Sequence, residues 1–103
     1  MARHKFNAKP TTTGGVRYDS KLEARYAQKL TLAQKSGELL FYLRQVPFDL
    51  PGNTKYRCDF AEFWADGEVK FSDCKGVETE VFRLKARQVE EIYGIRINIV
   101  KKV

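Results

Sequence analysis

The sequence predicts an α/β domain of the α+β type, with the element order αβββαβ and a mixed four-stranded sheet flanked by helices. Three observations lead to this prediction. Two segments have helix-capping residues at their ends, three segments between them are rich in aromatic and aliphatic residues, and the last segment alternates apolar with polar residues. A chain of 103 residues has room for one compact domain, which excludes large multi-domain enzymes.

The first helix is predicted over residues 20–36. Asp19 or Ser20 can accept a hydrogen bond from a free N–H of the first turn, and Gly37 is a typical residue at a helix end. On a helical wheel the apolar residues form one arc, and Glu23 falls inside that arc. A second flank of this helix is basic, with Lys21, Arg25 and Lys29.

Residues 1–17 are predicted to form a flexible basic arm, followed by a single domain over residues 18–103. The arm contains the run A-K-P-T-T-T-G-G and has no sustained periodicity. Residues 1–29 hold seven bases and two acids, so one end or face of the molecule is strongly positive. The bases of the arm that we expect to contact a polyanion are Arg3, Lys5, Lys9 and Arg17.

Three strands are predicted between the helices. Residues 39–50 are aromatic and aliphatic, and too short and proline-interrupted for a helix. Residues 55–64 and 68–75 flank the turn sequence A-D-G and therefore form an antiparallel hairpin.

The register of this hairpin depends on its loop. A two-residue loop would send Asp59 and Asp73 to opposite faces of the sheet. A three-residue loop, with Gly67 in the left-handed conformation, pairs the two aspartates instead. The second register also collects apolar residues on one face and sets Glu62 opposite Lys70 as a cross-strand ion pair, so we prefer it.

The second helix is predicted over residues 79–93, between a Thr79 cap and a Gly94 stop, and I-R-I-N-I-V follows as the last strand. Lys85 lies within the apolar arc of this helix. Two interpretations of Lys85 stay open. Its stem can be buried with the amine at the rim, or the amine can contact a DNA phosphate.

The charge and the residue composition indicate which partners and metal ligands the protein can have. The formal net charge of +6 indicates a polyanionic partner such as nucleic acid. The chain has no apolar run of membrane-spanning length and no apolar signal-peptide core, so we expect a cytoplasmic protein without a membrane partner. Two cysteines and one histidine exclude a disulfide framework and a zinc site, so any metal would have oxygen ligands.

The preferred register gathers charged residues on the apolar face of the hairpin. Asp59, Asp73 and Lys75 lie on this face, and two opposed carboxylates roughly 5 Å apart repel unless a cation or a proton intervenes. Mg²⁺ fits, with the aspartates and the main-chain carbonyl of Cys74 as ligands and Glu23 as a further ligand. Lys75 could then orient a water or stabilise charge on a phosphate.

Each of these residues alone also has a structural interpretation. A D-x-K sequence at a strand end is commonly an exposed salt bridge, and a single acid at a helix start commonly binds a backbone group. The combination of three inward acids and one inward lysine on a helix and two strands favours a catalytic site. For Gln45, a position facing the site and a hydrogen-bonded place in the core are equally compatible with the pattern.

These residues resemble the PD-(D/E)XK nuclease superfamily. The first acid lies in Y-D-S-K-L-E-A-R-Y, the second in Y-R-C-D-F and the third in S-D-C-K-G. The opening H-K-F-N-A-K and the later L-K-A-R are similar to small phage endonucleases and Holliday-junction resolvases, so the resemblance covers nearly the whole chain. The chain departs from that pattern at Val46-Pro47-Phe48 and at Cys58, before the second acid.

The resemblance implies a restriction-endonuclease-like core and Mg²⁺-dependent hydrolysis of phosphodiester bonds, with Mn²⁺ as a substitute. In this role Asp59 and Asp73 bind the metal, Glu23 assists and Lys75 is the catalytic lysine. The implied substrate is branched DNA, such as a four-way junction. Paired nicks on opposite strands need two related sites, so we expect a symmetric homodimer. A phage-encoded protein would act in the host cytoplasm.

Two other hypotheses remain open. One is a non-catalytic DNA-binding accessory protein that keeps the fold and the basic surface. The other is a nicking or restriction-like nuclease with another DNA substrate. The bases along the first helix and the arm would contact the DNA backbone in each case, because the chain has no base-reading motif.

Overall fold

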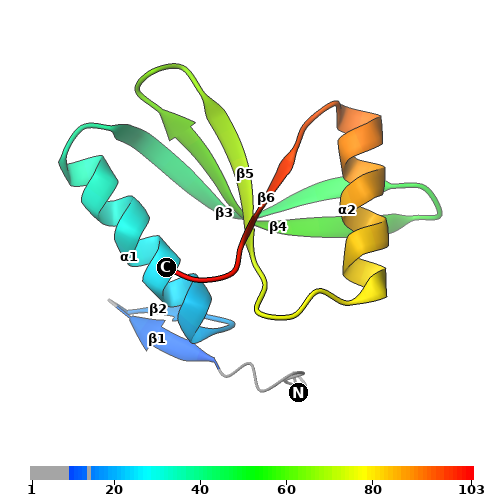
Figure 1. Cartoon of the computed structure of the whole chain (residues 1–103), viewed down its shortest axis with the longest axis horizontal. Helices are drawn as coiled ribbons and strands as arrows, with labels where there is room; N and C mark the ends of the chain where they lie inside the picture. Colours follow the sequence, from blue (N-terminus) through cyan, green and yellow to red (C-terminus); the bar gives the residue numbers. More distant parts are fainter. Residues whose placement is uncertain (1–9, 14) are drawn as a thin grey trace.

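A mixed four-stranded sheet in the order β3-β4-β5-β6 forms the centre of the computed structural model, which describes residues 10–13 and 15–103 (Figure 1). Strands β3, β4 and β5 are antiparallel neighbours, and β6 lies parallel to β5 at the edge. The strands are β3 (Leu39–Leu50), β4 (Thr54–Trp64), β5 (Val69–Cys74) and β6 (Ile97–Val100). With helices α1 (Lys21–Lys35) and α2 (Glu80–Tyr93), the order from α1 onward is the predicted αβββαβ, and the fold class is confirmed.

The two helices begin where their caps predict. Ser20 Oγ accepts a hydrogen bond of 3.1 Å from the Glu23 N–H at the start of α1. Thr79 Oγ1 accepts one of 3.1 Å from the Phe82 N–H at the start of α2. Gly94 ends α2 with a φ of 67°, a left-handed conformation that glycine adopts without strain.

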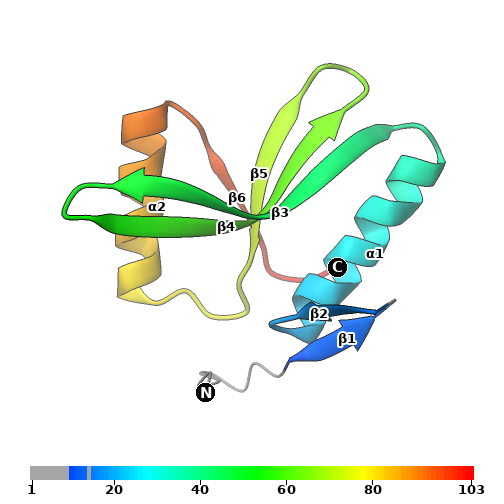
Figure 2. The same cartoon turned by 180° about the vertical axis from the view of Figure 1, so that it is seen from behind.

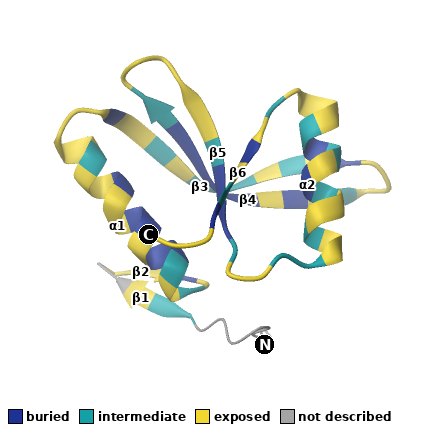
Figure 3. Cartoon of the chain, in the orientation of Figure 1, coloured by how far each residue is buried: buried dark blue, intermediate teal, exposed yellow. Residues whose placement is uncertain are grey.

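The helices cover different halves of the twisted sheet, and each half has its own apolar core. Figure 1 shows β3 and β4 running from the half that holds α1 to the half that holds α2, and Figure 3 shows buried residues in both halves. We define the α1 core as Tyr18, Ala24, Tyr26, Ala27, Leu30, Leu39, Phe60, Cys74 and Val100. We define the α2 core as Leu50, Tyr56, Cys58, Ala86, Val89 and Ile97. Because Cys58 and Phe60 belong to different cores, Asp59 lies where the two cores meet.

The β4–β5 hairpin has the register that a three-residue loop predicts. Glu62 pairs with Lys70, the Trp64 N–H donates to the Glu68 carbonyl at 2.9 Å, and Gly67 has a φ of 92°. The predicted ion pair between Glu62 and Lys70 is wrong, since Glu62 is fully buried and the Lys70 ammonium lies 3.7 Å from Glu68 instead. Helix α1 covers the face on which Glu62 lies, so the face that we expected to meet solvent is interior.

The described part of the expected arm is folded. Strands β1 (Thr11–Thr13) and β2 (Val16–Tyr18) pair antiparallel and lie beside the first turns of α1 (Figure 2). Tyr18 is buried in the α1 core. The flexible arm predicted through residue 17 is thus corrected over 11–13 and 15–17, while residues 1–9 and 14 lie outside the described part of the chain. Within the described residues, neither helix has the length and apolarity that crossing a membrane requires.

Candidate active site

Asp59 and Asp73 lie at the point where the hydrogen-bonded ladder between β4 and β5 ends. The last backbone pair of that ladder is Phe60 with Ser72. Beyond it, Asp73 Oδ1 accepts a bond of 2.9 Å from the Asp59 N–H, and Asp59 Oδ2 accepts one of 2.9 Å from the Cys74 N–H. In these two bonds, carboxylate oxygens accept from the backbone N–H groups in place of backbone carbonyls. The bonds hold both aspartates at the end of the β4–β5 ladder.

The two aspartates are buried and their acidity is altered. Asp73 is 1% exposed, and its Oδ2 has no hydrogen-bond partner among the described residues. Burial raises the pKa of Asp73 to about 6, against the opposite effects of the Asp59 N–H bond and the Lys75 charge. Burial also raises the pKa of Asp59. Two such carboxyls side by side favour a proton or a cation between them.

Lys75 follows directly after β5 and lies within electrostatic reach of both aspartates. Its charge lowers the pKa of Asp59 and of Asp73, although burial outweighs this effect. Its Nζ lies 5.1 Å from the ring centroid of Phe82, a cation–π contact with α2. The predicted catalytic lysine therefore approaches the aspartates from the α2 half of the molecule.

Glu23 approaches from the α1 half. The side chain is 2% exposed, and its Oε2 accepts bonds of 3.1 Å from Arg44 and 3.2 Å from Gln45. Burial and the nearby Asp59 charge raise the pKa of Glu23. As the sequence predicts, Glu23 points inward near Asp59, but the ion pair with Arg44 holds it on the far side of the Gln45 amide.

Gln45 connects the acids of the two halves. Its Nε2 donates to Glu23 Oε2 and to Asp59 Oδ1, at 3.2 Å in each case, so of the two open interpretations the structure places Gln45 at the site. Its φ of 53° is left-handed, which is rare for a non-glycine residue and strained within a strand. The consecutive side chains at 44 and 45 both reach Glu23 Oε2.

Arg44 is the site residue that sequence reasoning missed. Its guanidinium bonds Glu23 and lies 4.3 Å from the ring centroid of Tyr18. Strict alternation along the strand places Arg44 on the opposite face from Gln45, so the pattern gave no reason to combine them. A base in the middle of an apolar strand was the available signal, because such a residue needs an acid when it is partly buried.

The predicted DNA-contacting bases have different outcomes. Lys21, Arg25 and Lys29 are exposed along α1, and Arg17 is exposed on β2. Arg3, Lys5 and Lys9 lie outside the described residues. The Lys85 ammonium donates to the Lys55 carbonyl at 3.4 Å with a half-buried stem, which agrees with the interpretation of Lys85 as a rim lysine.

The acids fit a divalent cation only in part. Asp73 offers an unpartnered carboxylate oxygen, and carboxylates are ligands that Mg²⁺ prefers. Asp59 Oδ1 and Glu23 Oε2 are both occupied by the Gln45 amide. Within residues 10–13 and 15–103, no three side chains of His, Cys, Asp or Glu converge closely enough to hold a metal ion. A cation ligated by both aspartates would therefore need to displace the Gln45 amide.

Comparison with known proteins gives one match. No curated protein and no solved structure is similar to the chain at a significant level. Residues 3–102 match a family described as "Protein of unknown function (DUF1064)". Because this match spans nearly the whole sequence, the chain belongs to the DUF1064 family.

Proposed function

We propose that the protein is a metal-dependent DNA endonuclease that hydrolyses phosphodiester bonds in branched DNA, with the four-way junction as its substrate. The Asp59–Asp73 pair is the observation that carries this proposal. Two adjacent buried carboxyls with raised pKa values, one of them with an unpartnered oxygen, destabilise a fold unless a ligand compensates them. A divalent cation compensates both at once.

Each residue near the pair has a task in this proposal. Asp59 and Asp73 hold Mg²⁺ or Mn²⁺, with the Cys74 carbonyl as a further ligand. The cation, when bound, activates the phosphodiester and acidifies a water. Lys75 supplies positive charge where negative charge grows on the phosphate. Glu23, whose pKa is raised by burial and by the Asp59 charge, assists from across the Gln45 amide.

The position of the acids supports the resemblance to PD-(D/E)XK nucleases. From α1 onward the described order is αβββαβ, with one acid on α1, one on β4 and one on β5 followed by lysine. Glu23, Asp59 and Asp73 are all buried, and Lys75 is electrostatically coupled to the two aspartates. A protein with this role in DNA metabolism would work in the cytoplasm, or in that of the host if it is phage-encoded.

The exposed bases supply DNA affinity without base recognition. Lys21, Arg25 and Lys29 follow one flank of α1, which starts beside Glu23. Such bases neutralise phosphates and release counterions, so binding weakens as salt rises. Contacts to phosphates orient DNA but do not read sequence, which agrees with a substrate recognised by its shape.

A symmetric dimer would provide the two nicks that a junction requires. An exposed apolar strip on the sheet supports a second copy of the chain as partner. Phe41 and Phe63 stack across β3 and β4 with their ring centroids 4.5 Å apart. Phe41, Leu43 and Val69 are 44%, 50% and 46% exposed, which is unusual for neighbouring large apolar side chains.

Cleavage of labelled substrates tests the proposal. Four-way junction, replication fork, linear duplex and single strand are incubated with Mg²⁺, Mn²⁺ or EDTA. We expect paired nicks in the junction by the wild type with either metal, no cleavage in EDTA and none by Asp73→Asn or Asp59→Asn. Lys75→Ala should lose cleavage and keep metal binding. Unchanged cleavage by either aspartate variant would contradict the site, and cleavage of duplex alone would support a restriction-like nuclease instead.

A non-catalytic DNA-binding accessory protein is the second candidate. The observation that favours it is the Gln45 amide, which satisfies Glu23 and Asp59 internally without a metal. In that case the same assay would give tight junction binding and no cleavage with any metal. Binding without cleavage by the wild type would decide for this candidate.

A further inference from the structure

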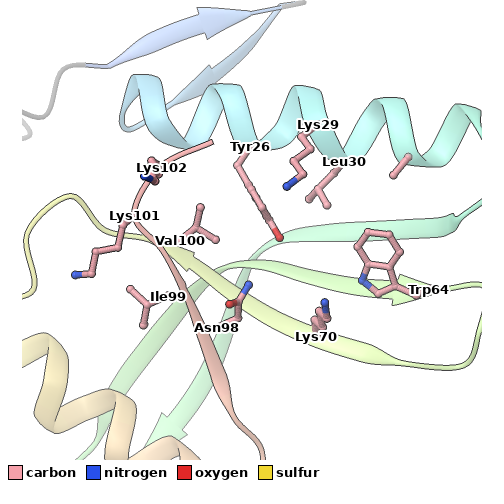
Figure 4. Close-up of a pocket in the computed structure, with 11 residues that line it drawn as sticks. Tyr26, Lys29, Leu30, Trp64, Lys70, Asn98, Ile99, Val100, Lys101 and Lys102 are labelled. Atoms are coloured by element: carbon pink, nitrogen blue, oxygen red, sulfur yellow. The ribbon is translucent and has the colours of Figure 1, made fainter.

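A pocket of about 400 Å³ lies between α1 and the β6 edge of the sheet, apart from the aspartate pair (Figure 4). We call it the lysine pocket. Its lining includes four lysines, two aromatic side chains and one amide, and it includes no acid. These residues are Lys29, Lys70, Lys101, Lys102, Tyr26, Trp64 and Asn98. Its size falls in the range of small-ligand sites.

Two of the four lysines in this pocket have an acidic neighbour outside its lining, which offsets its positive charge only in part. Lys101 forms an ion pair with Glu78, and Figure 4 shows its side chain turned away from the other lysines. Lys70 lies 3.7 Å from Glu68, but both side chains are about half exposed, so this pair is worth little. Lys29, from α1, and Lys70, from β5, therefore present positive charge from two sides of the same cavity.

Hydrogen bonds hold the indole ring of Trp64 in a fixed orientation in the pocket. Trp64 Nε1 donates to Glu62 Oε1 at 3.1 Å, and Glu62 Oε2 accepts a bond of 2.6 Å from the Tyr26 hydroxyl. Burial and the bond to Glu62 raise the pKa of Tyr26, so this hydroxyl keeps its proton. The Lys70 ammonium lies 5.6 Å from the ring centroid of Trp64. A fixed indole beside ammonium groups is the combination that stacks a base and binds its phosphate.

The floor of the pocket leads toward the aspartate pair. Asn98 Nδ2 donates to Ser72 Oγ at 3.0 Å, and the Tyr26 hydroxyl lies 3.3 Å from the same oxygen. Ser72 directly precedes Asp73 on β5. On α1, Glu23, Tyr26 and Lys29 follow one another at intervals of about one helical turn, roughly 5 Å each. Ser72 therefore connects the polar side chains beside the pocket to the strand that carries Asp73.

We propose that the lysine pocket binds one nucleotide of a DNA strand at a distance from the cleaved bond, with its base against Trp64 and its phosphate between Lys29 and Lys70. This inference rests on the proposed function in taking DNA as the ligand. It adds a nucleotide subsite that the aspartate pair, Lys21 and Arg25 do not supply, and it gives Lys29 a place in that subsite.

Fluorescence tests the pocket directly, because Trp64 is the single tryptophan of the chain. The full-length protein in EDTA is titrated with a short single-stranded oligodeoxynucleotide, a deoxynucleoside monophosphate or inorganic phosphate. We expect saturable quenching of the tryptophan emission by the oligonucleotide, and much weaker effects of the other two. Equal effects of the monophosphate and the oligonucleotide would overturn the assignment to a DNA strand. Binding of labelled oligonucleotide without any change of emission would overturn the pocket itself.

A double variant separates the pocket from general positive charge. Lys29→Ala/Lys70→Ala should weaken oligonucleotide affinity about tenfold and reduce the salt slope by about 1.4, roughly 0.7 for each lysine that no longer contacts the single strand. Lys35→Ala is the matched control, because Lys35 is an exposed lysine of the same helix outside the pocket. Equal affinity of the double variant and this control would overturn the proposal.

The outcomes for the pocket and for the nuclease are distinguishable. If the oligonucleotide quenches Trp64 and the protein never cuts DNA, the pocket is supported and the proposed nuclease is contradicted. If the protein cuts junctions and the double variant binds and cuts like the control, the nuclease is supported and the pocket is contradicted.

Discussion

The α1 core and the α2 core each pack one helix on half of the same sheet, but they bury different groups. The α2 core is built from aliphatic and aromatic side chains and a thiol. The α1 half also buries Glu23 and Glu62, whose carboxylates take hydrogen bonds from Arg44, Gln45, Tyr26 and Trp64. Buried carboxylates cost stability even when they are bonded. The α2 half therefore mainly stabilises the fold, and the α1 half holds the polar groups that a ligand can use.

The boundary between the two cores combines a strained backbone with buried carboxylates. Asp59 and Asp73 extend the end of the β4–β5 ladder with side-chain bonds, and Gln45 has a left-handed backbone beside them. Strain and buried like charges persist where the surrounding structure enforces them, and they concentrate at functional sites. Separate apolar cores on both sides provide that enforcement here.

The largest expected effect is a loss of stability when a buried side chain is removed from the α1 core. Phe60→Ala removes a fully buried ring that packs edge-on against Tyr26 and Tyr42, so we expect the free energy of unfolding to fall by about 3–5 kcal/mol. Urea unfolding measures this fall in the free energy of unfolding. Leu32→Ala is the control, since Leu32 is 66% exposed and should change stability by about 0.5 kcal/mol or less. Equal effects of the two substitutions would contradict the position of the core.

Asp73→Asn should stabilise the metal-free protein at neutral pH. The folded pKa of about 6 exceeds the ordinary 3.8, so the folded state holds its proton longer and wild-type stability falls as pH rises from 4 through 6. Asparagine cannot ionise, and its Oδ1 can still accept the Asp59 N–H. We expect a gain of about 1–3 kcal/mol over wild type at pH 7 that closes toward pH 4.

Urea unfolding in EDTA between pH 4 and pH 8 measures this difference. Asp49→Asn is the control, because Asp49 is exposed and pairs only with Lys55 among the described residues. A stability difference for Asp73→Asn that does not vary with pH would show that the carboxyl titrates normally.

Gln45→Gly and Gln45→Ala separate backbone strain from the amide bridge. Both substitutions remove the amide that joins Glu23 to Asp59, but only glycine adopts a φ of 53° without strain. We expect the glycine variant to be more stable than the alanine variant by about 1 kcal/mol. Thermal unfolding of the pair measures the difference, and a more stable alanine variant would refute the left-handed conformation.

The smallest effect concerns the surface charge of the two halves. Arg25→Ala, on α1, should weaken DNA binding and reduce the salt slope by about 1, because one phosphate contact is lost. Arg87→Ala removes an exposed base of α2 and should leave both quantities nearly unchanged. Fluorescence anisotropy over a range of salt concentrations measures both variants. Equal losses of DNA affinity in the two variants would mean that DNA does not bind preferentially to the α1 half.

Most of the fold could be predicted from local chemistry. Ser20, Thr79 and Gly94 mark helix ends through backbone groups that have no other partner, and Gly67 determines the hairpin register. Strands β1 and β2 could not be predicted, because three-residue strands are too short for a period to be seen. Their pairing depends on contact with α1, which is tertiary information.

Half of the candidate site could be predicted in the same way. The inward position of Glu23 and the pairing of Asp59 with Asp73 follow from helix and strand periods. The roles of Arg44 and Glu62 could not be found, since alternation assumes a regular strand with one solvent-facing side. The left-handed Gln45 breaks the first assumption, and the cover of α1 over β4 breaks the second.

Paramagnetic broadening of amide signals by Mn²⁺ is the most direct test of the claim that the aspartate pair between the two cores holds a divalent cation. Substoichiometric Mn²⁺ is added to the wild type and to Asp73→Asn in the absence of DNA. We expect the wild-type amide signals of Phe60, Cys74 and Lys75 to broaden first, and the same signals of the variant to stay sharp. Wild-type signals that remain sharp, or equal broadening in both proteins, would contradict a metal centre at this pair.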